Sequence, residues 1–141
     1  MIKYCHSKYL EYLNSLNYNS DQIALIWNDS YLSYNNILEF CKVFKFDIQF
    51  KSLIFIHSSS PLEIAKRYLW CLYNNHLPYI TSKKISNSDE LIINFTPNVI
   101  WDDKGFSILN NTDLNINTDL AFLLSTSGST GMAKLVKISW S

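Results

Sequence analysis

Residues 53–80 constrain the fold of this chain more than any other stretch. They begin with a compact apolar run, Leu-Ile-Phe-Ile-His, which is typical of a buried strand. A strong helix start follows, because Ser60 can cap a helix whose first residue is proline and whose third is glutamate. A second short apolar run occupies residues 77–80. The sequence therefore predicts a βαβ unit. The apolar face of its helix is predicted to consist of Leu62, Ile64, Ala65, Tyr68, Leu69 and Leu72.

Further strands and helices are predicted on both sides of this unit. The strand candidates are residues 24–27, 31–33, 98–101, 106–109, 120–124 and 135–138. The helix candidates are residues 7–16, residues 86–93 opened by Ser86 or Ser88, and a helix capped by Ser33 with Ile37, Leu38, Cys41 and Phe44 on its apolar face. Alternating strands and helices predict an α/β fold, a layered sheet-and-helix domain spanning residues 1–141.

The composition argues against several classes of partner. The 141 residues include 12 basic and 12 acidic side chains, so the formal net charge is zero. This balance gives no electrostatic reason to expect nucleic acid or an anionic membrane. The three cysteines are scattered and do not suggest a disulfide framework. Since no signal peptide or membrane span is evident, we expect a cytoplasmic protein.

The segment between the last two strand candidates has the chemistry of an anion-binding loop. Its hydroxyl groups can donate hydrogen bonds to phosphate oxygens, and its glycines allow backbone N–H groups to converge on an anion. Its lysine adds a compact positive charge. The candidate binding residues are Thr126, Ser127, Gly128, Ser129, Thr130, Gly131 and Lys134.

The spacing of this segment differs from the P-loop of kinases and GTPases. In a P-loop the second glycine is followed directly by Lys-Ser/Thr at the start of a helix. Here the lysine follows Gly131 by three residues and leads into the β-rich run Leu-Val-Lys-Ile.

The segment resembles the signature of the adenylate-forming (AMP-binding) superfamily, which includes acyl-CoA synthetases, nonribosomal-peptide adenylation domains and D-alanine carrier ligases. That signature is an apolar strand followed by Thr-Ser-Gly-Ser/Thr-Thr-Gly-x-Pro-Lys-Gly-Val. The chain matches it at all seven candidate residues and at Val136. It departs at Ala133, where the family has proline, at Leu135, where glycine is frequent, and at Trp140, near a position where histidine is common.

The resemblance implies a fold and a reaction. The chain would be the opening part of the large N-terminal domain of an adenylate-forming enzyme, a partial AMP-binding domain with the C-terminal domain absent. Such an enzyme uses ATP and Mg²⁺ to activate a carboxylic acid as an acyl-adenylate, which then passes to the thiol of CoA or of a phosphopantetheinyl carrier protein. The loop would hold the β- and γ-phosphates, and Lys134 would stabilise the charge that develops on pyrophosphate.

Two readings of function remain open. In the first, the chain is the N-terminal part of such a ligase and acts with the remainder of a split or longer protein. In the second, it is a truncated, catalytically inactive remnant or a small nucleotide- or protein-binding module. The family's adenine-binding stretch, acyl pocket and C-terminal catalytic lysine are not found in the sequence, so we expect no catalysis by this chain alone.

Other polar residues have structural interpretations. His57 is expected to be a satisfied histidine at a strand end, whereas His6 and His76 are expected at the surface. The pair at residues 102–103 is expected to form a turn and not a carboxylate site.

Overall fold

The computed structural model describes residues 21–86, 89–126 and 134–140, together with Glu11. In chain order its elements are β1 (Ile23–Trp27), β2 (Ser30–Ser33), α2 (Tyr34–Val43), β3 (Leu53–Ile56), α3 (Pro61–Tyr73), β4 (Leu77–Ile80), α4 (Glu90–Phe95), β5 (Val99–Asp102), β6 (Gly105–Ile108), β7 (Leu120–Thr126) and β8 (Lys134–Ser139). The helix predicted at residues 7–16 lies outside the described residues apart from Glu11, which is helical.

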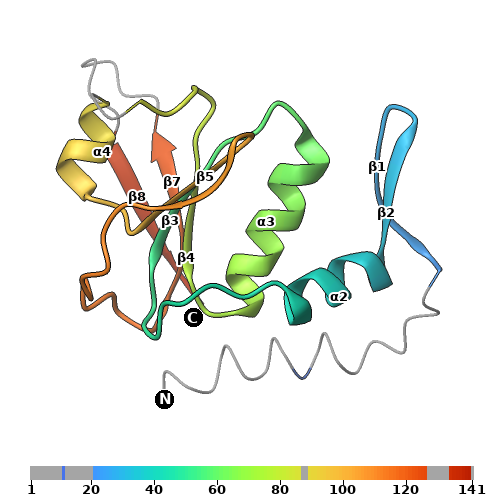
Figure 1. Cartoon of the computed structure of the whole chain (residues 1–141), viewed down its shortest axis with the longest axis horizontal. Coiled ribbons are helices and arrows are strands. Elements are labelled where there is room, and N and C mark those ends of the chain that lie inside the picture. The colour runs from blue at the N-terminus through green and yellow to red at the C-terminus, as the bar shows by residue number, and fades with distance from the viewer. Residues whose placement is uncertain (1–10, 12–20, 87–88, 127–133, 141) are drawn as a thin grey trace.

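The predicted βαβ unit forms the centre of a six-stranded sheet (Figure 1). The strand order is β6-β5-β3-β4-β7-β8. Strands β3, β4, β5 and β7 are parallel, whereas β6 and β8 pair antiparallel with their neighbours at the two edges. The hairpin of β1 and β2 forms a separate two-stranded sheet. The prediction of a layered α/β domain is therefore confirmed.

Alternate residues of β3 pack into two different cores. Ile54 and Ile56 lie in the core formed with α2 and α3, which also contains Trp70. Phe55 lies in a second core on the other side of the sheet, together with Ile92 of α4. Figure 1 shows α2 and α3 on one side of the sheet and α4 on the other. A central strand covered on both faces has to be apolar at every position, which explains the uninterrupted apolar run.

Helix α3 buries a face different from the predicted one. Its buried residues are Arg67, Trp70, Cys71 and Leu72. Of the predicted face only Leu72 belongs to this set, and the other members are partly buried. The helix is turned because the Trp70 ring packs edge-on against Trp101 of β5, with ring centroids 5.3 Å apart. Large rings bury more apolar area than the smaller side chains of the predicted face.

The first described helix begins as the sequence predicts. The Ser33 hydroxyl accepts a hydrogen bond from Asn36 N (3.1 Å), and the Asn36 side chain accepts one from Ser33 N (3.1 Å), which completes a capping box. Ser60 likewise caps α3, with its hydroxyl oxygen 3.4 Å from Glu63 N. Both caps are confirmed.

The start predicted for the short helix before β5 is wrong. Asp89 caps α4, accepting a hydrogen bond from Leu91 N at 3.1 Å, instead of Ser86 or Ser88. A carboxylate at this position also interacts favourably with the positive end of the helix dipole. Among the helices that the structure describes, α3 has 13 residues, and none could span a bilayer, which takes about 20 apolar residues.

Candidate functional site

The parallel strands place several polar segments at one edge of the sheet. His57 N donates to Trp101 O (3.0 Å) and Thr81 N donates to Ile56 O (2.9 Å), so the parallel ladders continue just past the ends of β3 and β4. Strand β7 runs in the same direction and ends at Thr126. In open sheets of this kind, ligands bind outside the carboxyl ends of the strands. The sheet therefore brings Thr126 and Lys134, the described residues of the predicted site, to the end of the strands where a ligand site is expected.

Thr126 and Lys134 form the closing pair of the β7–β8 hairpin. They are partners in the antiparallel register, and Thr126 Oγ1 donates to Lys134 O at 3.3 Å. The strands are longer than predicted, so both residues belong to strand ends and not to the loop between them. The remaining candidate residues, Ser127, Gly128, Ser129, Thr130 and Gly131, lie outside the described residues. The assignment of all seven to phosphate therefore stays a prediction.

The described hairpin carries positive charge only. Lys134 and Lys137 lie on β8, and residues 120–126 and 134–140 include no carboxylate. The side chains of Thr126 and Lys134 are both exposed, and directly paired residues project from the same face of a sheet. The ammonium group of Lys134 can donate to an anion as it stands, whereas the single hydroxyl proton of Thr126 would first have to leave Lys134 O.

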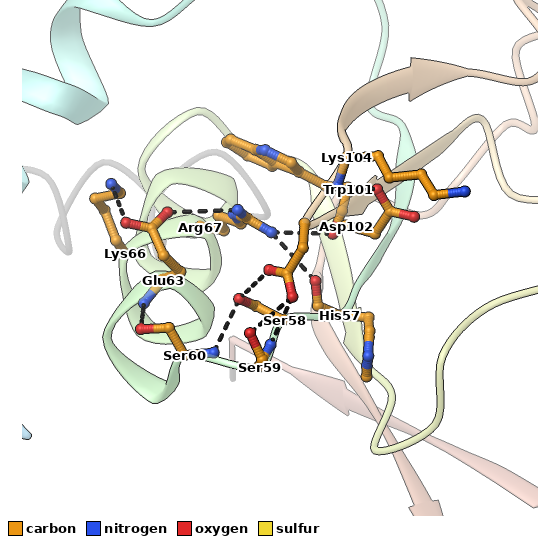
Figure 2. A network of polar contacts seen from close by, with 11 residues as sticks. His57, Ser58, Ser59, Ser60, Glu63, Lys66, Arg67, Trp101, Asp102 and Lys104 are labelled. Atoms are coloured by element: carbon orange, nitrogen blue, oxygen red, sulfur yellow. Dashed lines mark hydrogen bonds and ion pairs between the residues drawn. The ribbon is translucent and has the colours of Figure 1, made fainter.

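The end of β5 is joined to the segment after β3 by a carboxylate (Figure 2). Asp103 Oδ1 accepts from Ser58 Oγ (2.5 Å), and Asp103 Oδ2 accepts from Ser59 N (2.9 Å) and Ser59 Oγ (2.9 Å). These hydrogen bonds, the one from Ser58 first, lower the pKa of Asp103 to about 2. The expected turn is present, since Lys104 N donates to Asp102 Oδ1 at 2.9 Å. No residue pattern in the sequence predicted the contact of Asp103 with Ser58 and Ser59.

Arg67 binds the ends of the same two strands from inside the fold. Its guanidinium donates to His57 O (3.2 Å) and Trp101 O (3.4 Å), and it lies 5.5 Å from the centre of the Trp101 ring. Glu63, one turn earlier in α3, pairs with it at 3.4 Å. Figure 2 shows this group between the helix and the strand ends. Sequence reasoning missed Arg67; the only signal was the Glu63 spacing at i, i+4.

The described histidines have different outcomes. His57 Nδ1 lies 3.1 Å from Thr81 O, so the prediction of a satisfied histidine at a strand end is confirmed. His76 is not a surface residue as predicted. Its Nδ1 accepts from Ser52 N (3.2 Å) and its ring stacks on Trp70. Burial, with smaller contributions from Lys51 and Lys45, lowers the pKa of His76 to about 4.

A resident metal has no obvious set of protein ligands in the described part of the chain. Those residues contain no group of three or more His, Cys, Asp and Glu side chains that could hold a metal ion. Hydroxyl and ammonium donors are instead the groups that the hairpin end offers to a ligand.

Comparison with known proteins gives matches in structure only. The sequence matches no protein-family model and no curated protein. The fold is similar to O-succinylbenzoate coenzyme A synthetase (MenE) from Bacillus subtilis in complex with AMP, with a TM-score of 0.67 and 16% identity. It is also similar to the N-terminal subdomain of NpsA from Klebsiella oxytoca, with a TM-score of 0.58 and 16% identity.

The extent of these matches defines which part of the fold is shared. They cover 93% and 96% of this chain, but 42% and 41% of the MenE and NpsA chains. The chain thus spans about two fifths of the length of the structures it resembles. These 141 residues therefore share their fold with a part of O-succinylbenzoate coenzyme A synthetase and with a part of the NpsA N-terminal subdomain.

Proposed function

We propose that this chain supplies the phosphate-binding part of an AMP-dependent synthetase or ligase. The observation that supports this most is the place of the Thr126–Lys134 hairpin end. It lies at the carboxyl edge of a parallel sheet, within a fold similar to an enzyme whose structure was solved with AMP. In the proposal, residues 126–131 and Lys134 bind the phosphates of ATP.

The proposed reaction has two steps. A carboxylate oxygen attacks the α-phosphorus of ATP, forming an acyl-adenylate and releasing pyrophosphate. The thiol of CoA or of a phosphopantetheinyl carrier protein then attacks the acyl carbon, and AMP leaves. The ammonium group of Lys134 would hold the departing pyrophosphate, and the hydroxyl of Thr126 would join it on turning away from Lys134 O, because charge-assisted hydrogen bonds strengthen as negative charge develops.

Mg²⁺ belongs to this proposal as the companion of ATP. It would neutralise part of the charge on the phosphate oxygens. Lys134 suits the phosphates themselves, since an ammonium group only donates and cannot bind Mg²⁺, whereas the Thr126 hydroxyl oxygen could serve either the phosphates or Mg²⁺.

The second candidate function is nucleotide binding without catalysis, either as a small binding module or as an inactive remnant. It requires only donor groups for phosphate at the hairpin end, such as the exposed ammonium group of Lys134. Both candidates require the hairpin end to bind ATP. They differ in whether the residues are part of a working enzyme.

Titration of the purified chain with ATP tests the shared requirement. We expect Lys134→Gln to weaken binding about tenfold, because one charge-assisted contact to phosphate is lost. Lys137→Gln is the matched control, since it removes the same charge from an exposed site on the same strand. Equal affinities for Lys134→Gln and the unaltered chain, or no ATP binding at all, would refute the phosphate assignment.

Acid-dependent exchange of pyrophosphate into ATP separates the two candidates. We expect no exchange with this chain alone, since adenylation depends on positioning both substrates. Exchange that appears only when the complementary part of an adenylating enzyme is added would support the ligase reading. Exchange by the chain alone would show that these residues are sufficient.

A further inference from the structure

A polar cleft lies at the amino ends of the parallel strands, at the end of the sheet opposite to the Thr126–Lys134 hairpin end. Residues 45–51 connect α2 to β3, and together with the C-terminal end of α3 and the turn at residues 74–76 they enclose a volume of about 490 Å³. Ser52 and His76 directly precede β3 and β4, so the cleft lies at the amino ends of these strands. It is therefore separate from the Thr126–Lys134 hairpin end.

Two lysine side chains are fixed at this cleft. Lys45 Nζ donates to Asn74 Oδ1 at 2.9 Å. Lys51 Nζ donates to the carbonyl oxygens of Thr118 (3.1 Å) and Leu120. Because an ammonium group has three N–H bonds, Lys45 retains two donors and Lys51 retains one after these contacts.

The positive charge of the cleft is not balanced by its walls. No Asp or Glu lines it, although Asp47 lies in the same connection, and the positive charges of Lys51 and Lys45 contribute to lowering the pKa of His76. Burial lowers the pKa of Lys51 to about 8, with Asp119 acting in the opposite direction. The ammonium form of Lys51 therefore still predominates at pH 7. Two cations at one cleft match a ligand with two negative charges.

One wall of the cleft is a group of three rings, in which His76 and Trp70 are nearly parallel and Phe46 is tilted by 39° to His76 and by 42° to Trp70. The His76 ring stacks on Trp70 with centroids 5.3 Å apart and an interplanar angle of 11°. Phe46 lies 4.9 Å from His76 and 5.1 Å from Trp70, measured between ring centroids. Such a wall favours an apolar, planar body, since aromatic groups pack in offset or edge-on geometry at these distances.

The turn beside this wall carries an unsatisfied polar atom. Asn75 Oδ1 is buried and has no hydrogen-bond partner, and Asn75 has a positive φ of 58°. Asn75 lines the cleft, and a buried acceptor without a donor is costly, by roughly 1–3 kcal/mol. A fully ionised phosphate has no N–H or O–H group to donate to Asn75 Oδ1, so this atom is not part of the proposed phosphate contact.

We propose that this cleft binds a phosphate monoester with a planar apolar group. The phosphate lies between Lys45 and Lys51, and the planar group packs on Phe46 and His76. A phosphate monoester carries close to two negative charges at pH 7, which matches the two ammonium groups. The volume is within the range of small-molecule sites.

Phenyl phosphate is a suitable probe of this site, with inorganic phosphate and phenol as partial ligands. We expect phenyl phosphate to quench Trp70 fluorescence and to raise the pKa of His76 from about 4, because a dianion offsets the two lysine charges. Inorganic phosphate and phenol should bind at least about tenfold more weakly than phenyl phosphate. No change in either signal up to about 10 mM phenyl phosphate would overturn the proposal.

Single substitutions test where phenyl phosphate binds and distinguish this site from the proposed ATP site. Lys45→Gln should weaken phenyl phosphate binding about tenfold, whereas Lys104→Gln, an exposed lysine in the turn after β5, should leave it unchanged. Lys51→Gln should weaken binding to a similar extent if this variant folds. If Lys51→Gln does not fold, the result for Lys45→Gln decides whether the cleft binds phenyl phosphate. Lys134→Gln should leave the affinity for phenyl phosphate unchanged. If Lys134→Gln weakens this binding and Lys45→Gln does not, phenyl phosphate binds at the Thr126–Lys134 hairpin end, and the proposed site at Lys45 and Lys51 is refuted.

Discussion

At the scale of single residues, His76 is held as a neutral imidazole. Its Nδ1 accepts from Ser52 N, and a protonated ring could not accept that hydrogen bond. Burial of the ring and two nearby ammonium groups oppose protonation as well. The interaction thus couples the pH to the packing of Trp70, on which the ring lies.

This coupling predicts a loss of stability on mild acidification. The pKa of His76 falls from 6.5 to about 4 on folding, so the unfolded chain binds more protons between these pH values. The contribution of neutral His76 to the free energy of unfolding is complete above pH 6.5. It is lost as the pH falls from 6.5 toward 4, by at most about 1.4 kcal/mol per pH unit. Urea unfolding at several pH values measures it. In His76→Phe the free energy of unfolding should change less with pH between about 4 and 6.5. The same pH dependence in His76→Phe and the unaltered chain would contradict the assignment to His76.

Asp103 provides a residue-scale prediction in a different pH range. Ser58→Ala removes the hydrogen bond that contributes most to lowering the pKa of Asp103, so this pKa should rise from about 2 toward 3.8. The two bonds from Ser59 remain, and the rise should therefore be partial. Carboxyl carbon NMR titration measures the change. Ser107→Ala, at an exposed site on β6, is the control and should leave the pKa where it is.

At the scale of elements, the helices are set by their caps and by the rings they carry. Ser33 and Ser60 determine where α2 and α3 begin, because each satisfies backbone N–H groups that have no partner within the helix. The orientation of α3 about its axis depends instead on Trp70 and Arg67, which contact β5. Local sequence therefore fixes the start of a helix more tightly than it fixes the buried face.

The cap of α2 gives a prediction at this scale. Ser33→Ala removes the acceptor for Asn36 N and the capping box with it, which should lower the free energy of unfolding by about 1 kcal/mol. Ser30→Ala, an exposed serine at the start of β2, should change it by less than about 0.5 kcal/mol. Denaturant unfolding of both variants provides the comparison, and equal effects would show that the box contributes little.

At the scale of the whole molecule, two cores share one sheet. β3 lies between them, so each of its residues belongs to one core or the other. Phe55 is 1% exposed and packs edge-on against Tyr79 of the adjacent strand, with centroids 4.9 Å apart. Loss of its ring would open a void in the core beneath α4, which the layers on both sides could close only in part.

Phe55→Ala should therefore destabilise the whole domain. The expected cost is about 3–5 kcal/mol, a large part of the roughly 5–15 kcal/mol that stabilises an ordinary domain. Ile93→Ala is the control on the same side of the sheet, since Ile93 is 61% exposed and should contribute within about 0.5 kcal/mol. Thermal unfolding followed by circular dichroism measures both. A small effect of Phe55→Ala would indicate that this core is loosely packed.

The sequence by itself determined the order of the elements and the run of hydroxyl residues, glycines and a lysine between the last two strands. The runs that became β3, β4 and β7, the cap at Ser60 and the turn at Asp102 are encoded by neighbouring residues, so local reasoning identified them. The start of α4 was missed by a few residues because two serines and Asp89 compete for the same role.

Only the tertiary structure decided which distant residues meet. The Asp103 carboxylate binds Ser58, 45 positions earlier in the chain, and Ser52 N binds His76, 24 positions away. The position of β5 beside β3 instead of β4 creates the first contact, and burial under the aromatic rings creates the second. Such partners leave no periodic trace in the sequence, because segments so far apart in the chain come within hydrogen-bonding distance only once the sheet has formed.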